Sequence, residues 1–289
     1  MRIVLTGGTG YIGSALLDQL VAAGHTVTAL VRGDDAAGKV RKAGAEAAVG
    51  DLFDTGWVAE RFASADGVVH TAATGDARNA EFDRSVVRAA AQALAGTGKP
   101  YVHTSGIWIY GDNAGITEDS PFVPPALTAW RGAVERSVLD ADLTATIVAP
   151  GVVYGHGGGI PGGVLAAQRD EAGRVRLVGD GSQHWATVHV EDVAALYVTV
   201  VERGERLGYL VAASGVNPTV RELAEAAAGA AGVAPETADA SRERLGALFA
   251  DALLLDQQTA AAKAKALGWT PVRPALVEEL RTGSYPRLS

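Results

Sequence analysis

Three glycines with fixed spacing follow the first apolar run of the chain. Gly7, Gly10 and Gly13 come after residues 3–5, Ile-Val-Leu, a composition typical of a buried strand. In such a turn the first glycine allows a tight bend, the second lets backbone N–H groups approach a pyrophosphate, and the third lets helix and strand pack closely. The phosphates would lie at the positive end of the following helix. The spacing therefore predicts a dinucleotide site.

The residue after the second predicted strand indicates which dinucleotide is bound. That strand spans residues 26–31, and Arg32 follows it. An arginine here accommodates a 2′-phosphate, whereas a carboxylate would hydrogen-bond the ribose hydroxyls of NAD. Arg32 therefore favours NADP. If Arg32 is instead a solvated turn residue, Asp34 or Asp35 would serve NAD, so both cofactors stay open.

Predicted strands and helices alternate along the first half of the chain, and they must hold this turn in place. Helical patterns separate the apolar runs, and this rhythm predicts an α/β fold of Rossmann type with a doubly wound parallel sheet. The strands are predicted at residues 3–5, 26–31, 45–49, 68–70, 101–104 and 144–148.

A change of composition after Pro150 indicates a domain boundary. Glycines crowd residues 151–163, which is typical of a loop or lid that shapes a substrate pocket. We therefore expect residues 1–150 to form the nucleotide-binding domain. Residues 151–289 would form a smaller, mostly helical substrate subdomain, with about 186–215 returning to the sheet.

Two helices have well-marked ends. The first is predicted to stop at Gly24, since glycine is common just after a helix. A later one begins after Thr219, which forms the pattern of a capping box with Glu222. The apolar face of the first helix consists of Ile12, Leu16, Leu20 and Ala23.

Composition limits the partners and the compartment. A net charge of −8 and the lack of a basic run argue against nucleic acid or an anionic membrane, which leaves a small molecule as the expected partner. No cysteine is present, which excludes disulfides and thiolate chemistry, and no residue pattern indicates a metal site. The chain starts with a core strand, which leaves no room for a signal peptide, so we expect a cytoplasmic protein.

A series of motifs along nearly the whole chain resembles those of the extended short-chain dehydrogenase/reductase family. Besides the glycine turn they are Asp51-Leu52, His70-Thr71-Ala72-Ala73, Tyr110-Gly111 and residues 150–155, 179–182, 188–193 and 267–271. The cofactor-binding residues that this resemblance and the turn imply are Gly7, Gly10, Tyr11, Ile12, Gly13, Arg32, Asp51, Leu52, Thr71, Ala72, Ala73, Thr104, Ser105, Pro150 and Val153.

The catalytic residues that the resemblance implies are missing. Members of the family carry a Tyr-x-x-x-Lys pair on one helical face, and the alignment places Trp130 and Val134 at these positions. Gly106 falls where the family has serine or threonine. The nearest lysine, Lys99, lies at the wrong end of the fifth strand. These departures resemble an atypical subgroup that includes a ketoreductase acting on the angucyclinone of simocyclinone biosynthesis.

Replacement acids are few, and each has a structural alternative. Tyr110 lies in a motif that is commonly structural, and Tyr154 could anchor the glycine-rich segment. Arg131 stays protonated and is expected at the surface or in a dimer contact. The histidines considered, each with packing, bracing or solvation as the alternative, are His103, His156 and His189.

Aromatic residues on segments expected near the pocket suggest a planar substrate, although ordinary core packing is the alternative. The resemblance to the atypical subgroup is what implies an aromatic polyketide substrate, and with it we expect an NADPH-dependent reductase of a polycyclic aromatic ketone in which a phenol of the substrate supplies the proton. The alternatives are an NADP-sensing regulator and a sugar-nucleotide epimerase or dehydratase. Helices near residues 79–95 and 127–139 would either form a homodimer or pack internally. The predicted substrate residues are Gly106, Ile107, Trp108, Trp130, Tyr154 and Trp185.

Overall fold

The computed structural model describes residues 1–166 and 168–285. These residues divide into two compact units. The first consists of residues 1–105, 130–149 and 194–210, and the second of residues 106–129, 150–193 and 211–289. Residues 106–129 thus group with the second unit, whereas the sequence analysis placed them in the nucleotide-binding domain.

The first unit is built on the predicted parallel sheet. The strand order is β11-β7-β5-β4-β1-β2-β3, which extends the order typical of dinucleotide-binding folds. Register is fixed at the centre, where Leu5 lies opposite Ala29 of one neighbour and Val69 of the other. The strands are β1 (Arg2–Thr6), β2 (Thr26–Val31), β3 (Glu46–Val49), β4 (Gly67–His70), β5 (Pro100–Thr104), β7 (Thr144–Pro150) and β11 (Gly208–Ala212).

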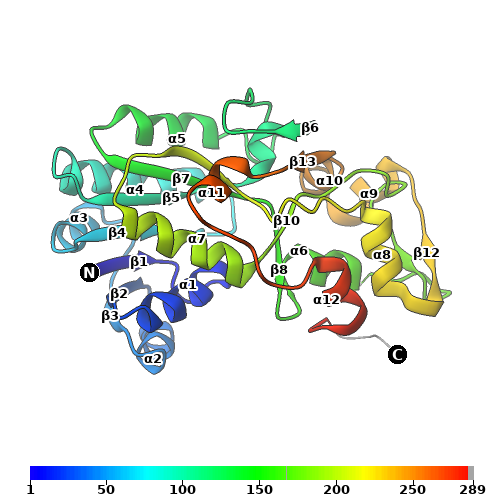
Figure 1. The fold of residues 1–289 in the computed structure, drawn as a ribbon, viewed down its shortest axis with the longest axis horizontal. Helices are drawn as coiled ribbons and strands as arrows, with labels where there is room; N and C mark the ends of the chain where they lie inside the picture. Colours follow the sequence, from blue (N-terminus) through cyan, green and yellow to red (C-terminus); the bar gives the residue numbers. More distant parts are fainter. Residues whose placement is uncertain (167, 286–289) are drawn as a thin grey trace. The chain divides into compact units, whose positions relative to one another are not determined.

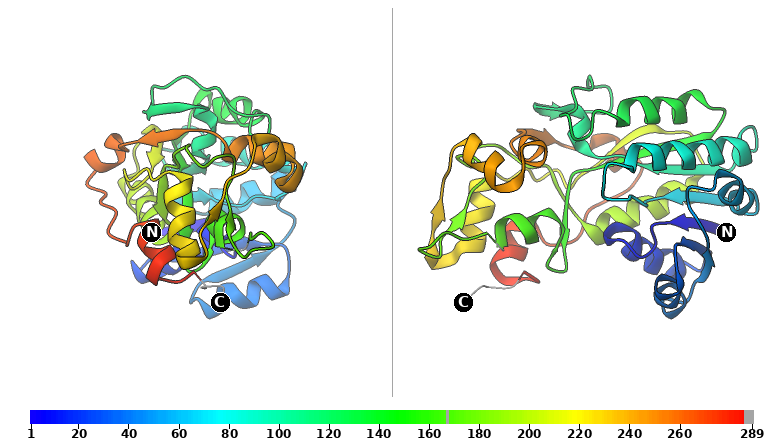
Figure 2. Two further views of the ribbon diagram at one scale, coloured as in Figure 1. Left: turned by 90° about the vertical axis from the view of Figure 1, so that its right-hand side faces the viewer. Right: turned by 180° about the vertical axis from the view of Figure 1, so that it is seen from behind.

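Helices cover both faces of this sheet, which explains why its strands are short and apolar. Helices α3, α4 and α5 lie on one face and α1, α2 and α7 on the other (Figure 1). Figure 2 shows α4 and α5 side by side, and the two helices are in contact. The bounds are α1 (Tyr11–Ala22), α2 (Asp34–Lys42), α3 (Thr55–Ala63), α4 (Asn79–Leu94), α5 (Arg131–Asp140) and α7 (Val190–Arg203).

The end of α1 confirms one prediction and corrects another. Gly24 has a φ of +82°, a backbone conformation that favours glycine, and the helix ends just before it. Ala23 is exposed and caps the helix. It therefore does not belong to the buried face on which we expected it.

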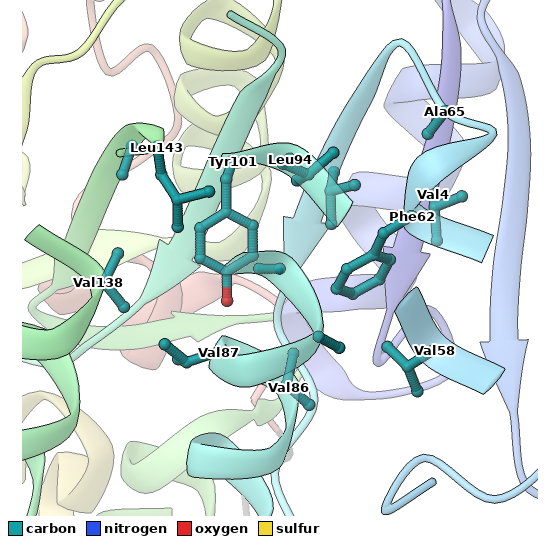
Figure 3. Close-up of a cluster of buried hydrophobic side chains, with 14 of the residues drawn as sticks. Val4, Val58, Phe62, Ala65, Val86, Val87, Leu94, Tyr101, Val138 and Leu143 are labelled. Carbon is teal, nitrogen blue, oxygen red and sulfur yellow. The ribbon is translucent and has the colours of Figure 1, made fainter. Parts of the chain in front are cut away.

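One hydrophobic core of this unit lies between the sheet and helices α3 to α5. Figure 3 shows the ring of Tyr101 among Val87, Val138 and Leu143, with Phe62 in the same cluster. All five side chains are almost fully buried. This packing fixes α4 and α5 against the sheet and so positions the polar residues that they carry.

In its described residues, the second unit has its own core and three short parallel strand pairs. These are β8 (Val152–Gly155) with β10 (Thr187–His189), β9 (Val175–Arg176) with β12 (Val233–Ala234), and β6 (Asn113–Ile116) with β13 (Gln257–Thr259). The helices are α6 (Gly159–Pro161), α8 (Val220–Ala228), α9 (Ala238–Leu245), α10 (Ala247–Leu253), α11 (Ala262–Ala266) and α12 (Leu276–Thr282).

The predicted capping box at the start of α8 is confirmed. The hydroxyl of Thr219 accepts the backbone N–H of Glu222 at 3.1 Å, and Glu222 Oε2 accepts the backbone N–H of Thr219 at 2.8 Å. Each side chain therefore satisfies a backbone donor of the other residue, and the helix start is fixed locally.

The glycine-rich segment after Pro150, which we predicted as a loop or lid, contains regular secondary structure. It contains β8, α6 and a π-helical turn that begins at Gly162. A Cβ on Gly151 would overlap the carbonyl oxygen of Ala186, and one on Gly162 would lie 2.6 Å from the carbonyl oxygen of Gly157. Glycine is needed at both positions because two backbones approach closely.

Candidate active site

A pocket of about 710 Å³ opens where β1, β2 and β4 end. In open α/β sheets ligands bind at the carboxyl ends of the strands, where the strand order reverses. Phe53, Thr74 and Phe82 also line the pocket and were not predicted from the sequence. The predicted cofactor residues in its lining are Gly7, Gly10, Arg32, Leu52, Thr71, Ala72 and Ala73.

The glycine turn is built so that no side chain fills the pocket floor. Gly7 has a φ of +81°, and a Cβ there would lie 2.6 Å from the backbone nitrogen of Ala72. A Cβ on Gly13 would overlap the carbonyl oxygen of Gly7. Helix α1 starts after Gly10 without a side-chain cap. Gly7, Gly10 and Gly13 thus form a turn without side chains, which we call the cradle. Because the helix beside it starts without a side-chain cap, a pyrophosphate bound there would accept hydrogen bonds from the helix N-terminus.

The other predicted cofactor residues do not line this pocket. The carboxylate of Asp51 accepts the backbone N–H of Phe53 at 2.9 Å and so shapes its own loop. Tyr11, Ile12, Gly13, Thr104 and Ser105 are in the first unit outside the lining, and Pro150 and Val153 belong to the second unit.

Charged residues of both signs border the pocket at the end of β2. Arg32, Asp34 and Asp35 all line it and are exposed. The two aspartates lie in the first turn of α2, where carboxylates interact favourably with the helix dipole. They therefore have a structural role there, while Arg32 remains available for a ligand anion.

A cluster of buried polar side chains lies directly behind the residues of the pocket wall. Asp83 follows the pocket residue Phe82, and its Oδ1 lies 3.3 Å from Nε2 of His70. Its Oδ2 lies 3.7 Å from Nε2 of His103. On its other side, His70 Nδ1 lies 2.6 Å from the hydroxyl of Thr6. The carboxylate thus joins α4 to the ends of β4 and β5.

Arg131 enters the same cluster from the first residue of α5, which corrects our expectation of a surface or dimer-contact residue. Its Nη1 donates to the carbonyl oxygen of Thr104 at 3.1 Å. The same nitrogen lies 3.9 Å from Asp83 Oδ2 and 3.8 Å from Glu135 Oε1. The side chain is 17% exposed. The guanidinium therefore points inward, toward two carboxyl groups.

Burial is the largest influence on the pKa of His103 and of Glu135, but it is outweighed at Asp83. It lowers the pKa of His103 to about 3, so this ring is neutral. Burial also raises the pKa of Glu135, whose Oε2 accepts the hydroxyl of Tyr209 at 2.8 Å. It opposes the ionisation of Asp83, but the hydrogen bond from His70 and the charge of Arg131 outweigh it, and the pKa of Asp83 falls. The cluster thus holds Asp83 as an anion beside the cation of Arg131.

The three positions aligned with the family's catalytic set hold no proton donor. Val134 is buried in the core of the first unit, and Trp130 packs partly exposed against the same core. The guanidinium of Arg131 lies 4.6 Å from the centre of the Trp130 ring. Gly106 is extended, and a Cβ there would meet nothing within 4 Å. Nothing in the packing therefore requires glycine at this position.

The aromatic candidates of the second unit have packing partners within it, and for Tyr154 this is the anchoring alternative considered from the sequence, while the substrate contacts stay a prediction. The Tyr154 hydroxyl donates to the carbonyl oxygen of Pro274 at 2.7 Å, and burial raises the pKa of this phenol. Trp185 is buried and its Nε1 donates to the carbonyl oxygen of Leu253 at 3.0 Å. Trp108 packs edge-on against Phe249.

Tyr110 and Ile107 are also buried in the second unit. The ring of Tyr110 packs edge-on against Phe122. The carbonyl oxygen of Ile107 accepts a hydrogen bond from Nε2 of Gln257 at 3.0 Å. Both residues therefore stabilise the short helical turn at residues 107–110.

Two histidines near the glycine-rich segment have structural partners. His156 is 64% exposed and lies 2.9 Å from Glu191 Oε1. His189 accepts the backbone N–H of Glu191 at 3.1 Å, and its ring packs edge-on against Tyr154. His189 therefore braces this segment, one of the alternatives considered from the sequence.

Neither a metal site nor a membrane span is found in the described residues. In residues 1–166 and 168–285, no group of three or more His, Cys, Asp or Glu side chains could hold a metal ion. Within the same part of the chain, the helices are too short or too polar to cross a bilayer.

Known proteins are similar to this chain in sequence and in fold. The sequence model of the NAD dependent epimerase/dehydratase family matches residues 3–211. An uncharacterized protein of Saccharomyces cerevisiae is 30% identical over 97% of this chain and 98% of its own length. A 4-hydroxy-2-methyl-3-oxo-4-farnesyl-3,4-dihydroquinoline-1-oxide ketoreductase of Stigmatella aurantiaca is 32% identical over 71% of this chain and 65% of its own length. A human epimerase family protein solved with NADPH matches with a TM-score of 0.76 at 22% identity, covering 98% of this chain and 99% of that one.

Proposed function

This chain belongs to the NAD dependent epimerase/dehydratase family, and from that premise we propose that it reduces a polycyclic aromatic ketone with NADPH. The observation that carries the proposal is the pocket at the glycine turn, which has a side-chain-free floor and Arg32 at its border. The relative from Stigmatella aurantiaca, a ketoreductase by name, supports ketone reduction as the reaction class.

The residues of the pocket fit a nicotinamide dinucleotide. The cradle of Gly7, Gly10 and Gly13 and the uncapped start of α1 would hold the pyrophosphate. Arg32 would pair with the 2′-phosphate that distinguishes NADP from NAD. When bound, the nicotinamide supplies a hydride to the carbonyl carbon.

The family's tyrosine acid is replaced by Trp130, and the neighbouring Arg131 does not take over its role. Its guanidinium donates to the carbonyl oxygen of Thr104 and faces the buried carboxyl groups of Asp83 and Glu135. Because guanidinium does not deprotonate in proteins, it cannot hand over a proton. A missing general acid costs about 10²- to 10⁴-fold in rate, whereas orientation contributes roughly 7 to 11 kcal/mol. Orientation by the protein therefore outweighs the loss of the acid.

The proton comes from the substrate in this proposal. A phenol hydrogen-bonded to the ketone donates its proton to the carbonyl oxygen while the carbonyl carbon takes the hydride. Water then returns a proton to the phenolate. This chemistry requires a hydroxyl on the ring next to the ketone, as in angucyclinone-type polyketides, and the indole of Trp130 is suited to stack on such a flat ring.

The test is an assay with NADPH and aromatic ketones that carry a hydroxyl peri to the carbonyl, followed by absorbance at 340 nm and product mass. Matched ketones with this hydroxyl methylated serve as controls. We expect reduction of the free phenols and its loss on methylation. The variant Trp130→Tyr, assayed alongside, is expected to regain activity on the methylated ketones, because it returns a tyrosine to the family's position.

Each other outcome identifies a different error. Equal reduction of the methylated ketones would show that the proton has another source. Tight binding of NADPH without its oxidation by any ketone would favour a regulator that senses NADP. Interconversion of nucleotide sugars would place the chain with the epimerases of its family instead.

A further inference from the structure

A second arginine is stacked on an aromatic residue of the same pocket. Arg78 precedes α4, and its guanidinium carbon is 4.0 Å from the centre of the Phe53 ring. Phe53 itself lines the pocket, as does Arg32 from the end of β2. Arg78 is thus one aromatic side chain away from the pocket.

The carboxylate of Asp76 links Arg78 to a residue of the pocket. Asp76 Oδ1 accepts the backbone N–H of Arg78 at 2.9 Å and the hydroxyl of the pocket residue Thr74 at 2.7 Å. The pKa of Asp76 is lowered by the hydrogen bond from Thr74, the backbone N–H of Arg78 and the charges of Arg78 and Arg32. Both arginines therefore act on the same exposed carboxylate.

We propose that Arg78 is a specificity-determining residue for NADP: together with Arg32 it holds the 2′-phosphate, and Asp76 is the anion that this phosphate competes with. The inference rests on the proposed function, because it takes a nicotinamide dinucleotide as the ligand of the pocket.

Arg78 would favour phosphate binding in two ways, through its positive charge and through the ordering of its side chain. A second cation would strengthen the binding of a phosphate dianion at an exposed site, since a single exposed ion pair contributes little in water. Guanidinium matches phosphate geometry, and stacking on Phe53 orders Arg78 before the ligand arrives, which lowers the entropy lost on binding. Asp76 is held by two hydrogen bonds and cannot swing away, so it repels the phosphate.

A salt bridge within the helix is the structural alternative for Arg78. Its Nε lies 3.6 Å from Oε2 of Glu81, and both side chains are about 60% exposed. Such a pair within one helical turn is weak and leaves the Nη side of the guanidinium for another anion. Binding measurements distinguish the two roles of Arg78, because only a contact with the 2′-phosphate would make its loss weaken the binding of NADPH more than that of NADH.

The experiment is calorimetric titration of the full chain with NADPH, NADH and 2′,5′-ADP. Arg78→Met removes the charge but keeps an unbranched side chain on Phe53. We expect it to weaken NADPH and 2′,5′-ADP roughly 5- to 20-fold, as for one charge-assisted contact at an exposed site, and to leave NADH within about twofold. Arg61→Met is the matched control, because Arg61 also stacks on an aromatic ring, but that ring belongs to Trp57, which does not line the pocket as Phe53 does.

Asp76→Asn tests the competing anion separately. The amide oxygen can still accept from Thr74 and from the backbone of Arg78, so the turn is kept while the charge is lost. We expect tighter binding of NADPH, unchanged binding of NADH, and a smaller difference at high salt, where exposed charges are screened.

The outcomes separate the inference from the function on which it rests. Equal weakening of NADPH and NADH by Arg78→Met would show that Arg78 contacts a part common to both, and no weakening would show that it only pairs with Glu81. Either result overturns the role of Arg78 while the dinucleotide site stands. If the unmodified protein binds neither dinucleotide, the proposed function fails and the inference fails with it.

Discussion

The guanidinium of Arg131 is the one cation that faces the buried carboxyl groups of Asp83 and Glu135 within the described part of the chain. Asp83 remains ionised although it is buried, because His70 bonds to it and Arg131 supplies the opposite charge. A buried pair of this kind adds little net stability when it is complete, but removing one partner is costly, since the other charge stays behind without compensation.

Arg131→Met is therefore expected to lower the free energy of unfolding by about 3 kcal/mol, as measured by urea denaturation. The matched control is Arg136→Met on the same helix, where the side chain is exposed and the change should be within about 0.5 kcal/mol. Equal effects of the two substitutions would contradict the inward placement of Arg131.

Helices α1 and α2 each contain a glycine, but a close backbone contact requires glycine in α1 and not in α2. Gly13 lies where a Cβ would overlap the backbone of Gly7, whereas a Cβ on Gly38 in the middle of α2 would meet nothing within 4 Å. Glycine inside a helix is less favourable than alanine by roughly 0.5 to 1 kcal/mol when no contact requires it. The same substitution should therefore have opposite effects in the two helices.

Gly38→Ala is expected to raise the free energy of unfolding by roughly 0.5 to 1 kcal/mol and to leave NADPH binding unchanged. Gly13→Ala is expected to destabilise the fold and to abolish NADPH binding, because the turn must open. Thermal unfolding and calorimetry measure both. Tight NADPH binding by the Gly13→Ala protein would rule out the cradle as the pyrophosphate site.

The sequence was sufficient for elements that local signals determine. The glycine turn, the six strands and the capping box at Thr219 depend on neighbours within a few residues, and each forms where it was predicted. Contacts between residues far apart in the sequence determine the features that were not predicted. Tyr154 bonds to Pro274 and Arg131 to Thr104, and neither pairing has a signal in the sequence around those residues.

One missed feature of α4 did leave a signal. Asp83 lies on the same helical face as Val86, Val87 and Ala90, all of them buried. A carboxylate within an apolar stripe indicates a buried partner of opposite charge or a hydrogen-bond donor, and His70 and Arg131 supply both.

The same helix also bears on the predicted homodimer, which stays a prediction. Ala89 and Ala90 of α4 pack inside the first unit, and the exposed positions of this helix carry Glu81, Arg84, Arg88 and Gln92. Charges of both signs therefore lie on the exposed side of α4, and a twofold contact there and internal packing both stay open.

For the whole molecule, acidification has two opposing effects on stability. The net charge of −8 falls toward zero near the pI of about 5.3, which reduces repulsion between surface carboxylates. That gain is small at physiological ionic strength, because screening acts within about 8 Å. The second effect is the protonation of buried groups, which depends on the difference in pKa between the folded and the unfolded chain.

The buried His103 is expected to dominate, so that stability falls below about pH 6.5 even as the net charge approaches zero, although the raised pKa of Glu135 acts with the opposite sign. The pKa of His103 is about 3 in the folded protein against 6.5 ordinarily, and between these values the unfolded chain binds a proton that the folded chain excludes. The free energy of unfolding should therefore drop by up to about 1.4 kcal/mol per pH unit, and the lowered pKa of Asp83 acts with the same sign at lower pH. Urea denaturation between pH 5 and 8 measures the slope, which His103→Asn should flatten. His156→Asn is the control, because that histidine is exposed beside Glu191, and a slope that follows His156 instead would place the titration at the surface.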